Sequence, residues 1–193
     1  MKVIEKVLSK DNLNEAYKQV IRNKGASGID KMTCEEVKDY LKVNGDKLIN
    51  QILNREYQPL PVRRVEIPKP NGGIRKLGVP TIVDRIIQQA LVQVLTPIFE
   101  PTFSEYSYGF RPNRRCQNAI DRTLELTNNG YEWIVDLDLE KFFDNVPHDK
   151  LIRIIDNEIK DSDITSLIMK YLKSGVMING TVEETNVGTP QGG

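Results

Sequence analysis

The sequence is poor in the side chains that most often bind zinc. It contains one histidine, His148, and two cysteines, Cys34 and Cys116, which lie far apart. This argues against a zinc site, which needs several Cys or His ligands at short spacing, and against a Ser-His-Asp triad. We expect His148 to be a packed or capping residue. Two distant cysteines favour reduced thiols and a cytoplasmic location.

Long apolar runs and net charge are also missing. No run of 18 or more apolar residues occurs, and the N-terminus lacks the apolar core of a signal peptide, so we expect no membrane partner. The net charge is zero, but residues 1–54 carry +2, residues 55–122 carry +5 and residues 123–193 carry −7. A basic middle beside an acidic end suits a protein that holds polyanions with one part and metal ions with another.

The basic middle of the chain begins with a predicted β-hairpin. Alternating stretches at 62–67 and 74–79 flank the turn sequence Pro-Asn-Gly-Gly at 70–73, and both stretches carry Arg and Lys. These charges are often only a solvated edge that prevents aggregation. Alternatively the hairpin grips phosphates, because the Arg fork matches phosphate oxygens and Lys supplies a mobile point charge.

A second basic stretch, residues 106–115, mixes three aromatic residues with three arginines. This combination can stack bases and hold a sugar-phosphate backbone. It can equally be a turn with a Tyr and Phe core and solvated arginines, and composition leaves both interpretations open.

Apolar spacing predicts most of the helices. We expect helices over 11–22, over 81–95 with a stop at Pro97, and up to about residue 127, with further helices after Pro147. Asn44-Gly45 is expected to end one helix before another begins. Asn179-Gly180 predicts the tip of a short hairpin over 176–182.

The stretch 133–139 is predicted to be a strand with acidic residues on one face. Val135, Leu137 and Leu139 alternate with Asp136 and Asp138. Two carboxylates on one face need a cation, a basic partner or water. A solvated edge strand with both acids in water is the plainer interpretation.

Taken in order, the segments resemble the reverse transcriptase domain of group II intron-encoded proteins, the intron maturases. Residues 25–30 resemble the N-terminal insertion loop of that domain. Its four following motifs resemble the stretches 67–80, 108–112, 138–148 and 188–192. Each stretch is short, but the shared order and spacing argue against chance.

The resemblance implies an α+β, right-hand reverse-transcriptase fold. Residues 1–125 would form mostly helical fingers with the insertion loop and the β-hairpin. Residues 126–193 would form an incomplete palm sheet that ends before the aromatic-Ala-Asp-Asp motif, so we expect a piece of a longer protein. The missing palm strands would leave a sheet edge exposed, through which a homodimer is expected to form.

The reaction implied by the resemblance is RNA-directed DNA synthesis with two Mg²⁺ ions, which stabilise the attacking and leaving oxygens. Its partners would be template or intron RNA, a DNA primer and dNTP, in a bacterial cytoplasmic ribonucleoprotein. Asp138 would be the catalytic metal ligand, joined by the backbone carbonyl of Leu139. Because one assigned aspartate cannot hold two Mg²⁺ ions, we expect these 193 residues alone to be inactive in primer extension.

The resemblance also assigns the residues that would hold the nucleotide and the RNA. Lys69 and Arg75 would hold the triphosphate, Phe143 would exclude a 2′-hydroxyl, and Gln191 would contact the nucleotide or its template partner. The residues expected to bind RNA are Arg63, Arg64, Arg111, Arg114, Arg115, Lys24 and Lys31. Two alternatives remain: an RNA-binding splicing cofactor only, or a related bacterial reverse transcriptase from a retroelement or a defence system.

Overall fold

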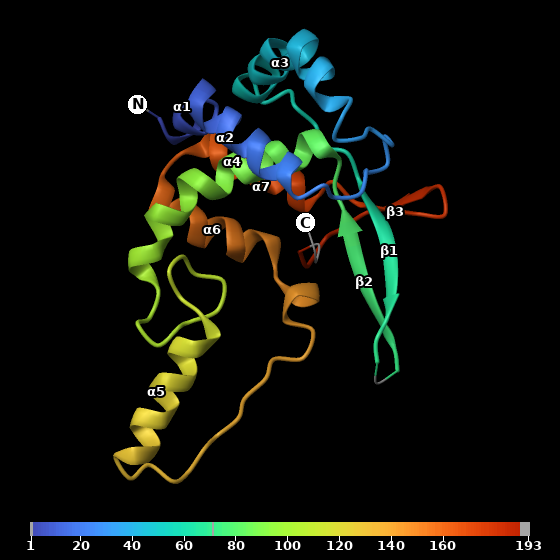
Figure 1. Cartoon of the computed structure of the whole chain (residues 1–193). Helices are drawn as coiled ribbons and strands as arrows, with labels where there is room; N and C mark the ends of the chain where they lie inside the picture. The colour runs from blue at the N-terminus through green and yellow to red at the C-terminus, as the bar shows by residue number, and fades with distance from the viewer. Residues whose placement is uncertain (1, 71, 190–193) are drawn as a thin grey trace. The chain divides into compact units, whose positions relative to one another are not determined.

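The computed structural model describes residues 2–70 and 72–189, so Gln191 lies outside the described residues. Helices and strands both occur, and the expected α+β class is confirmed (Figure 1). The helices are α1 (Val3–Val7), α2 (Lys10–Arg22), α3 (Val37–Leu53), α4 (Ile82–Phe99), α5 (Cys116–Asn128), α6 (His148–Ile159) and α7 (Ser162–Leu172), with short 3₁₀ turns η1 (Glu100–Thr102) and η2 (Phe142–Asn145). The strands are β1 (Val62–Pro68), β2 (Ile74–Val79), β3 (Val176–Ile178) and β4 (Thr181–Glu183).

Backbone contacts divide the chain into two compact units. The first unit comprises residues 1–95 and 141–193, and the second comprises residues 96–140. The boundary between fingers and palm at residues 125 and 126 stays a prediction.

The first unit contains one four-stranded sheet with the order β2-β1-β3-β4. β1 and β2 form the expected antiparallel basic hairpin, and β3 and β4 form the expected short one. The two hairpins are joined because β1 pairs with β3 in parallel, with Val62 opposite Val176. Segments more than a hundred residues apart in sequence therefore share one sheet.

Helix α4 supplies much of the core of the first unit. Its buried apolar residues are Ile82, Val83, Ile86, Ile87, Ala90 and Leu91. The expected stop at Pro97 was wrong by two residues, because a proline in the last turn removes only one hydrogen bond before the helix ends at Phe99. Residues 82–102 are long and apolar enough to span a membrane, but core helices of soluble proteins pass the same test. This helix has such a buried face.

Helix α3 contradicts the expected break at Asn44-Gly45. It runs without interruption from Val37 to Leu53. A glycine inside a helix costs about 1 kcal/mol relative to alanine, which weakens the helix but does not force it to end. The Asn44 side chain donates to the carbonyl of Tyr40 at 3.0 Å, which satisfies this polar group on the helix surface.

The expected strand over 133–139 was also wrong. Residues 131–139 form neither helix nor strand, and every one of them is exposed. The apolar side chains expected to share one face are exposed, Val135 by 81% and Leu137 by 87%. A strand requires a partner for its backbone groups. No strand in the described part of the chain pairs with this segment.

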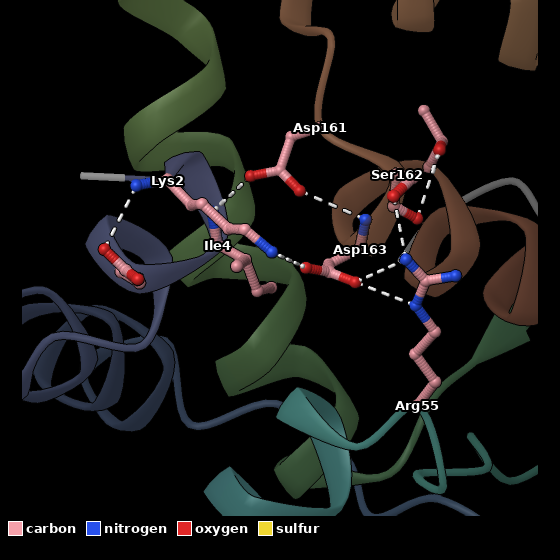
Figure 2. Close-up of polar contacts among 8 residues, drawn as sticks. Lys2, Ile4, Arg55, Asp161, Ser162 and Asp163 are labelled. Atoms are coloured by element: carbon pink, nitrogen blue, oxygen red, sulfur yellow. Dashed lines mark hydrogen bonds and ion pairs between the residues drawn. The ribbon is translucent and has the colours of Figure 1, made fainter.

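Two carboxylates at the start of α7 connect it to α1 and to Arg55 (Figure 2). Asp161 accepts a hydrogen bond from the backbone N–H of Asp163 and another from that of Ile4, both at 3.0 Å. Asp163 accepts from the Lys2 ammonium at 3.1 Å and from the Arg55 Nε at 2.7 Å. Residues at both ends of the sequence are therefore held together by charged hydrogen bonds.

We expect the folded chain to lose the stabilisation contributed by Asp163 at acid pH. Hydrogen bonds from Arg55, and then from Lys2, hold the pKa of its carboxyl below the ordinary value of 3.8. When the folded-state pKa is lowered, the stabilisation is complete above the unfolded-state pKa and is lost as pH falls through the folded-state pKa. Urea unfolding should show Asp163→Asn less stable than the unsubstituted chain at pH 7, by at most about 1 kcal/mol because Lys2 is largely exposed and Arg55 is half-exposed. The difference should shrink towards pH 3, and a difference independent of pH would contradict this assignment.

Candidate functional site

A buried carboxylate holds together the two ends of the basic hairpin. Asp84, in the first turn of α4, accepts from the Tyr57 hydroxyl at 2.6 Å and from the Thr81 hydroxyl at 2.7 Å. Tyr57 precedes β1, and Thr81 follows β2. Burial raises the pKa of Asp84, while these donors oppose that shift by stabilising the carboxylate. The hairpin therefore projects from a fixed base.

The loop over residues 23–31 is attached to the same base. The Arg63 guanidinium donates to the Ser27 carbonyl through Nε at 3.1 Å and Nη2 at 2.9 Å. Arg85, on α4, donates to the Ala26 carbonyl. Gly28 lies so close to Thr81 that a Cβ on Gly28 would be 2.7 Å from the Thr81 nitrogen. Arg63 thus holds a protein loop, a role that sequence reasoning had missed.

The cations of the hairpin are divided between its two faces. Residues directly opposite each other in an antiparallel pair point to the same face. Arg75 is opposite Ile67 and shares a face with Arg63, whereas Arg64 and Lys76 alternate to the other face, opposite Gly78 and Glu66. Lys69 lies one residue beyond β1, where its backbone N–H donates to the Gly73 carbonyl at 3.0 Å.

A groove of about 140 Å³ lies beside the second of these faces. Its lining comes from both hairpins, from η2 and from the segment that follows β4: Val62, Arg64, Lys76, Gly78, Asp144, Val176, Thr185, Val187, Gly188 and Thr189. Two cations and one carboxylate therefore line a small concave site. Lys76, Asp144 and Thr189 were not among the predicted site residues, although the alternation of the hairpin sequence was a usable signal for Lys76.

The segments 143–148 and 187–189 meet at the end of this groove through backbone hydrogen bonds. Gly188 N–H donates to the Val146 carbonyl at 2.9 Å, and Thr189 N–H donates to the Phe143 carbonyl at 2.7 Å. Pro147 and Val187 form an antiparallel bridge. The expectation that His148 is a packed residue agrees with its 4% exposure. The structure thus joins parts of the third and fourth motifs. Phe143 remains about half exposed beside this junction.

In the second unit, arginines and aromatic residues contact each other. Arg111 forms an ion pair with Glu100 at 2.8 Å, and its side chain is only 8% exposed. Its guanidinium also lies 5.5 Å from the ring centre of Phe103, and that of Arg114 lies 5.4 Å from the ring centre of Tyr108. Arg111 thus has protein partners on several sides, whereas Arg115 is exposed.

Asp138 and Leu139 lie in the exposed segment of the second unit, and Lys24 and Lys31 are exposed in the first. The carboxylate of Asp138 and the carbonyl of Leu139 are hard oxygen donors, which fit Mg²⁺ in kind. Within residues 2–70 and 72–189, no three or more His, Cys, Asp or Glu side chains converge into a group that could hold a metal ion. The described residues therefore offer only part of a coordination shell.

Residues 67–193, about two thirds of the chain, match the family model described as reverse transcriptase (RNA-dependent DNA polymerase). The chain belongs to the reverse transcriptase family. It is 39% identical over 180 residues to group II intron-encoded protein LtrA of Lactococcus lactis subsp. cremoris, covering 92% of this chain and 30% of LtrA. It is also 34% identical over 94 residues to nuclear intron maturase 1, mitochondrial, of Arabidopsis thaliana, covering 49% of this chain and 13% of that protein.

Among solved structures, the reverse transcriptase fold is matched in a chain of a partial Cas6-RT-Cas1--Cas2 complex. The TM-score is 0.65 with 23% identity, covering all of this chain and 32% of that one. At this identity the likeness concerns the fold alone. The reverse transcriptase fold of the chain is thus confirmed. The chain spans about a third of the length of LtrA and of that structural neighbour.

Proposed function

We propose that this chain handles template and nucleotide in an RNA-directed DNA polymerase encoded by a group II intron. The observation that carries the proposal is the meeting of three motif segments in the first unit. The basic hairpin, the segment 143–148 and the segment 187–189 all contribute to one groove and its rim. Nearly the whole chain is similar to part of LtrA, which is named as an intron-encoded protein. This similarity favours an intron-encoded protein over one from a defence system.

In the proposed reaction, each group of residues has a separate task. Arg75 and Lys69, which lie outside the lining of the groove, neutralise the triphosphate from the exposed end of the hairpin, and the exposed Phe143 ring packs against the sugar. Asp138 and the Leu139 carbonyl would hold Mg²⁺ through their oxygens, and Gln191 would contact the nucleotide or its template partner. Mg²⁺ bound there would stabilise the charge on the attacking and leaving oxygens. Arg64, Arg114, Arg115, Lys24 and Lys31 hold RNA phosphates, while Arg63 and Arg111 act mainly by holding protein segments.

RNA binding by the 193-residue chain tests the template part of this proposal. Cations that neutralise phosphates release counterions, so affinity should fall steeply as salt rises. Replacing Arg64 and Arg115 with Gln should lower the slope of log affinity against log salt by about 2, because each phosphate contact contributes close to one unit. The exposed Lys18 and Lys47, on helices α2 and α3, are suited as a Gln control pair. A flat salt dependence would contradict the proposal.

Assistance to intron splicing is a second candidate function. The relative from Arabidopsis thaliana is named an intron maturase, and such a role needs a basic RNA-binding surface but no metal-binding carboxylate. The two functions are compatible in one protein. Splicing of the cognate intron with and without the intact gene product measures this activity separately from DNA synthesis.

Self-association through residues 131–139 forms part of the proposal. This segment exposes Trp133, Ile134, Val135, Leu137 and Leu139, and apolar runs of this kind are typically covered by a partner. We propose a homodimer for the chain when it is isolated. Light scattering of the chain should detect it, and a monomer at all concentrations would contradict it.

A further inference from the structure

His148 is buried, and its ring has a defined hydrogen bond. It is the first residue of α6 and is 4% exposed. The ring Nε2 lies 2.7 Å from the carbonyl oxygen of Gly188. A carbonyl oxygen can only accept, so Nε2 must carry the proton. Nδ1 is buried and has no hydrogen-bond partner in the part of the chain that the structure describes. The contact with Gly188 is therefore the polar interaction that explains a buried imidazole here.

Gly188 accepts this hydrogen bond through its carbonyl oxygen, and its position tolerates neither a side chain nor much backbone displacement. Its φ is +81°, and a Cβ would lie 2.7 Å from the carbonyl oxygen of Asp144 and 3.0 Å from that of Phe143. The next residue, Thr189, donates its N–H to the Phe143 carbonyl. A displacement of Gly188 would thus move Thr189 relative to Phe143.

We propose that His148 is a positioning residue for the incoming nucleotide. Its Nε2–H fixes the segment 187–189 against residues 143–146, and so it sets how Thr189 lies relative to Phe143. The ring contacts no nucleotide itself. This inference rests on the proposed function, because it assigns Phe143 to the nucleotide sugar.

A purely structural role for His148 predicts a different kinetic result. If the loss of the ring only unfolds some molecules, the concentration of active enzyme falls, so kcat falls and KM for dNTP stays constant. If the ring positions Gly188, the folded molecules have a displaced nucleotide site. KM for dNTP then rises, and selection of dNTP over rNTP weakens.

Three variants of the intact gene product separate these cases in primer extension on an RNA template. Gln carries an amide N–H at a distance from the backbone similar to that of Nε2, whereas Asn has the same amide on a shorter side chain. We expect His148→Ala and His148→Asn to raise KM for dNTP about tenfold, the effect of losing one buried hydrogen bond, and to reduce dNTP selection. His148→Gln should restore both to within about threefold. Primer–template affinity, measured separately, should be unchanged in all three.

The outcomes distinguish failure of the inference from failure of the proposed function. Suppose that the unsubstituted protein copies RNA. The positioning role is then wrong if the His148→Asn and His148→Gln variants have the same KM for dNTP, or if the substitutions lower only kcat. If the unsubstituted protein does not copy RNA, the proposed function is wrong. The hydrogen bond can be tested without activity, because the chain has one histidine. Nitrogen-15 NMR of the 193-residue chain should show the single ring with a proton on Nε2, and an Nε2 without a proton would overturn the geometry.

Discussion

Replacing Asp138 with Ala should abolish RNA-directed DNA synthesis by the intact gene product. The change removes the carboxylate proposed to bind Mg²⁺ where charge develops on the transferred phosphoryl group. A metal ion in this position contributes several kcal/mol to transition-state stabilisation, and each 1.36 kcal/mol corresponds to a factor of ten in rate. We therefore expect a loss of at least about 10³-fold in primer extension, measured as single-nucleotide incorporation with saturating dNTP.

Asp136→Ala is the matched control for this prediction. Asp136 is also an exposed aspartate and lies two residues before Asp138 in the same irregular segment. Its loss should leave synthesis within a few-fold of the unsubstituted protein, as expected for an exposed position outside the metal shell. RNA binding and intron splicing should survive in both variants, because neither activity uses a metal ion bound by Asp138. Equal losses in the two variants, or full activity of Asp138→Ala, would refute the assignment of Asp138.

Local sequence signals predicted the hairpins accurately. The turn at 70–73 gave the basic hairpin, and Asn179-Gly180, with φ of +50° and +86°, gave the short one. Both turns need residues that tolerate positive φ, and such residues stand next to each other in the sequence, where they can be recognised. The parallel pairing of β1 with β3 could not be predicted in the same way. It depends on partners far apart in sequence, and no local pattern specifies that register.

The segment 133–139 shows why a correct pattern can still give a wrong element. Its alternation is that of a strand, but the pattern records which side chains would share a face and not whether a neighbouring strand is present. In the described residues the segment has no such neighbour and is irregular. At Gly45 the opposite occurs, because a residue that disfavours helix is present but helix α3 continues through it. In both cases the tertiary context decides between local alternatives.

The candidate site was predicted in part. Motif order located the hairpin, Phe143 and the segment near Gly188, and the structure brings parts of all three to one groove and its rim. The roles of the arginines could not be derived from composition, because it does not reveal which guanidinium has a protein partner. Arg63 holds the Ser27 carbonyl, and Arg111 holds Glu100, so neither is simply a free cation for RNA.

Asp161→Ala should produce a large loss of stability, although Asp161 lies outside the proposed site. One carboxylate accepts from the N–H of Asp163 at the start of α7 and from the N–H of Ile4 in α1 (Figure 2). Losing a helix cap costs about 1 kcal/mol, and leaving the buried Ile4 N–H without an acceptor costs a further 1–3 kcal/mol, roughly. We expect the free energy of unfolding to fall by about 2–4 kcal/mol in urea titration, with a Tm lower by about 5–15 °C.

Two further variants test whether this loss arises from the shared carboxylate. Asp161→Asn keeps one acceptor oxygen, so it can serve only one of the two N–H groups and should lose about half as much stability. Asp156→Ala, at an exposed position of α6, should change the free energy of unfolding by less than about 0.5 kcal/mol. Because Asp161 links residues 157 positions apart in sequence, its loss should also release α1 first. Hydrogen exchange of the Ile4 amide would then accelerate more than that of amides in α4, and equal acceleration in both helices would show that the carboxylate stabilises the unit as a whole and does not hold α1 specifically.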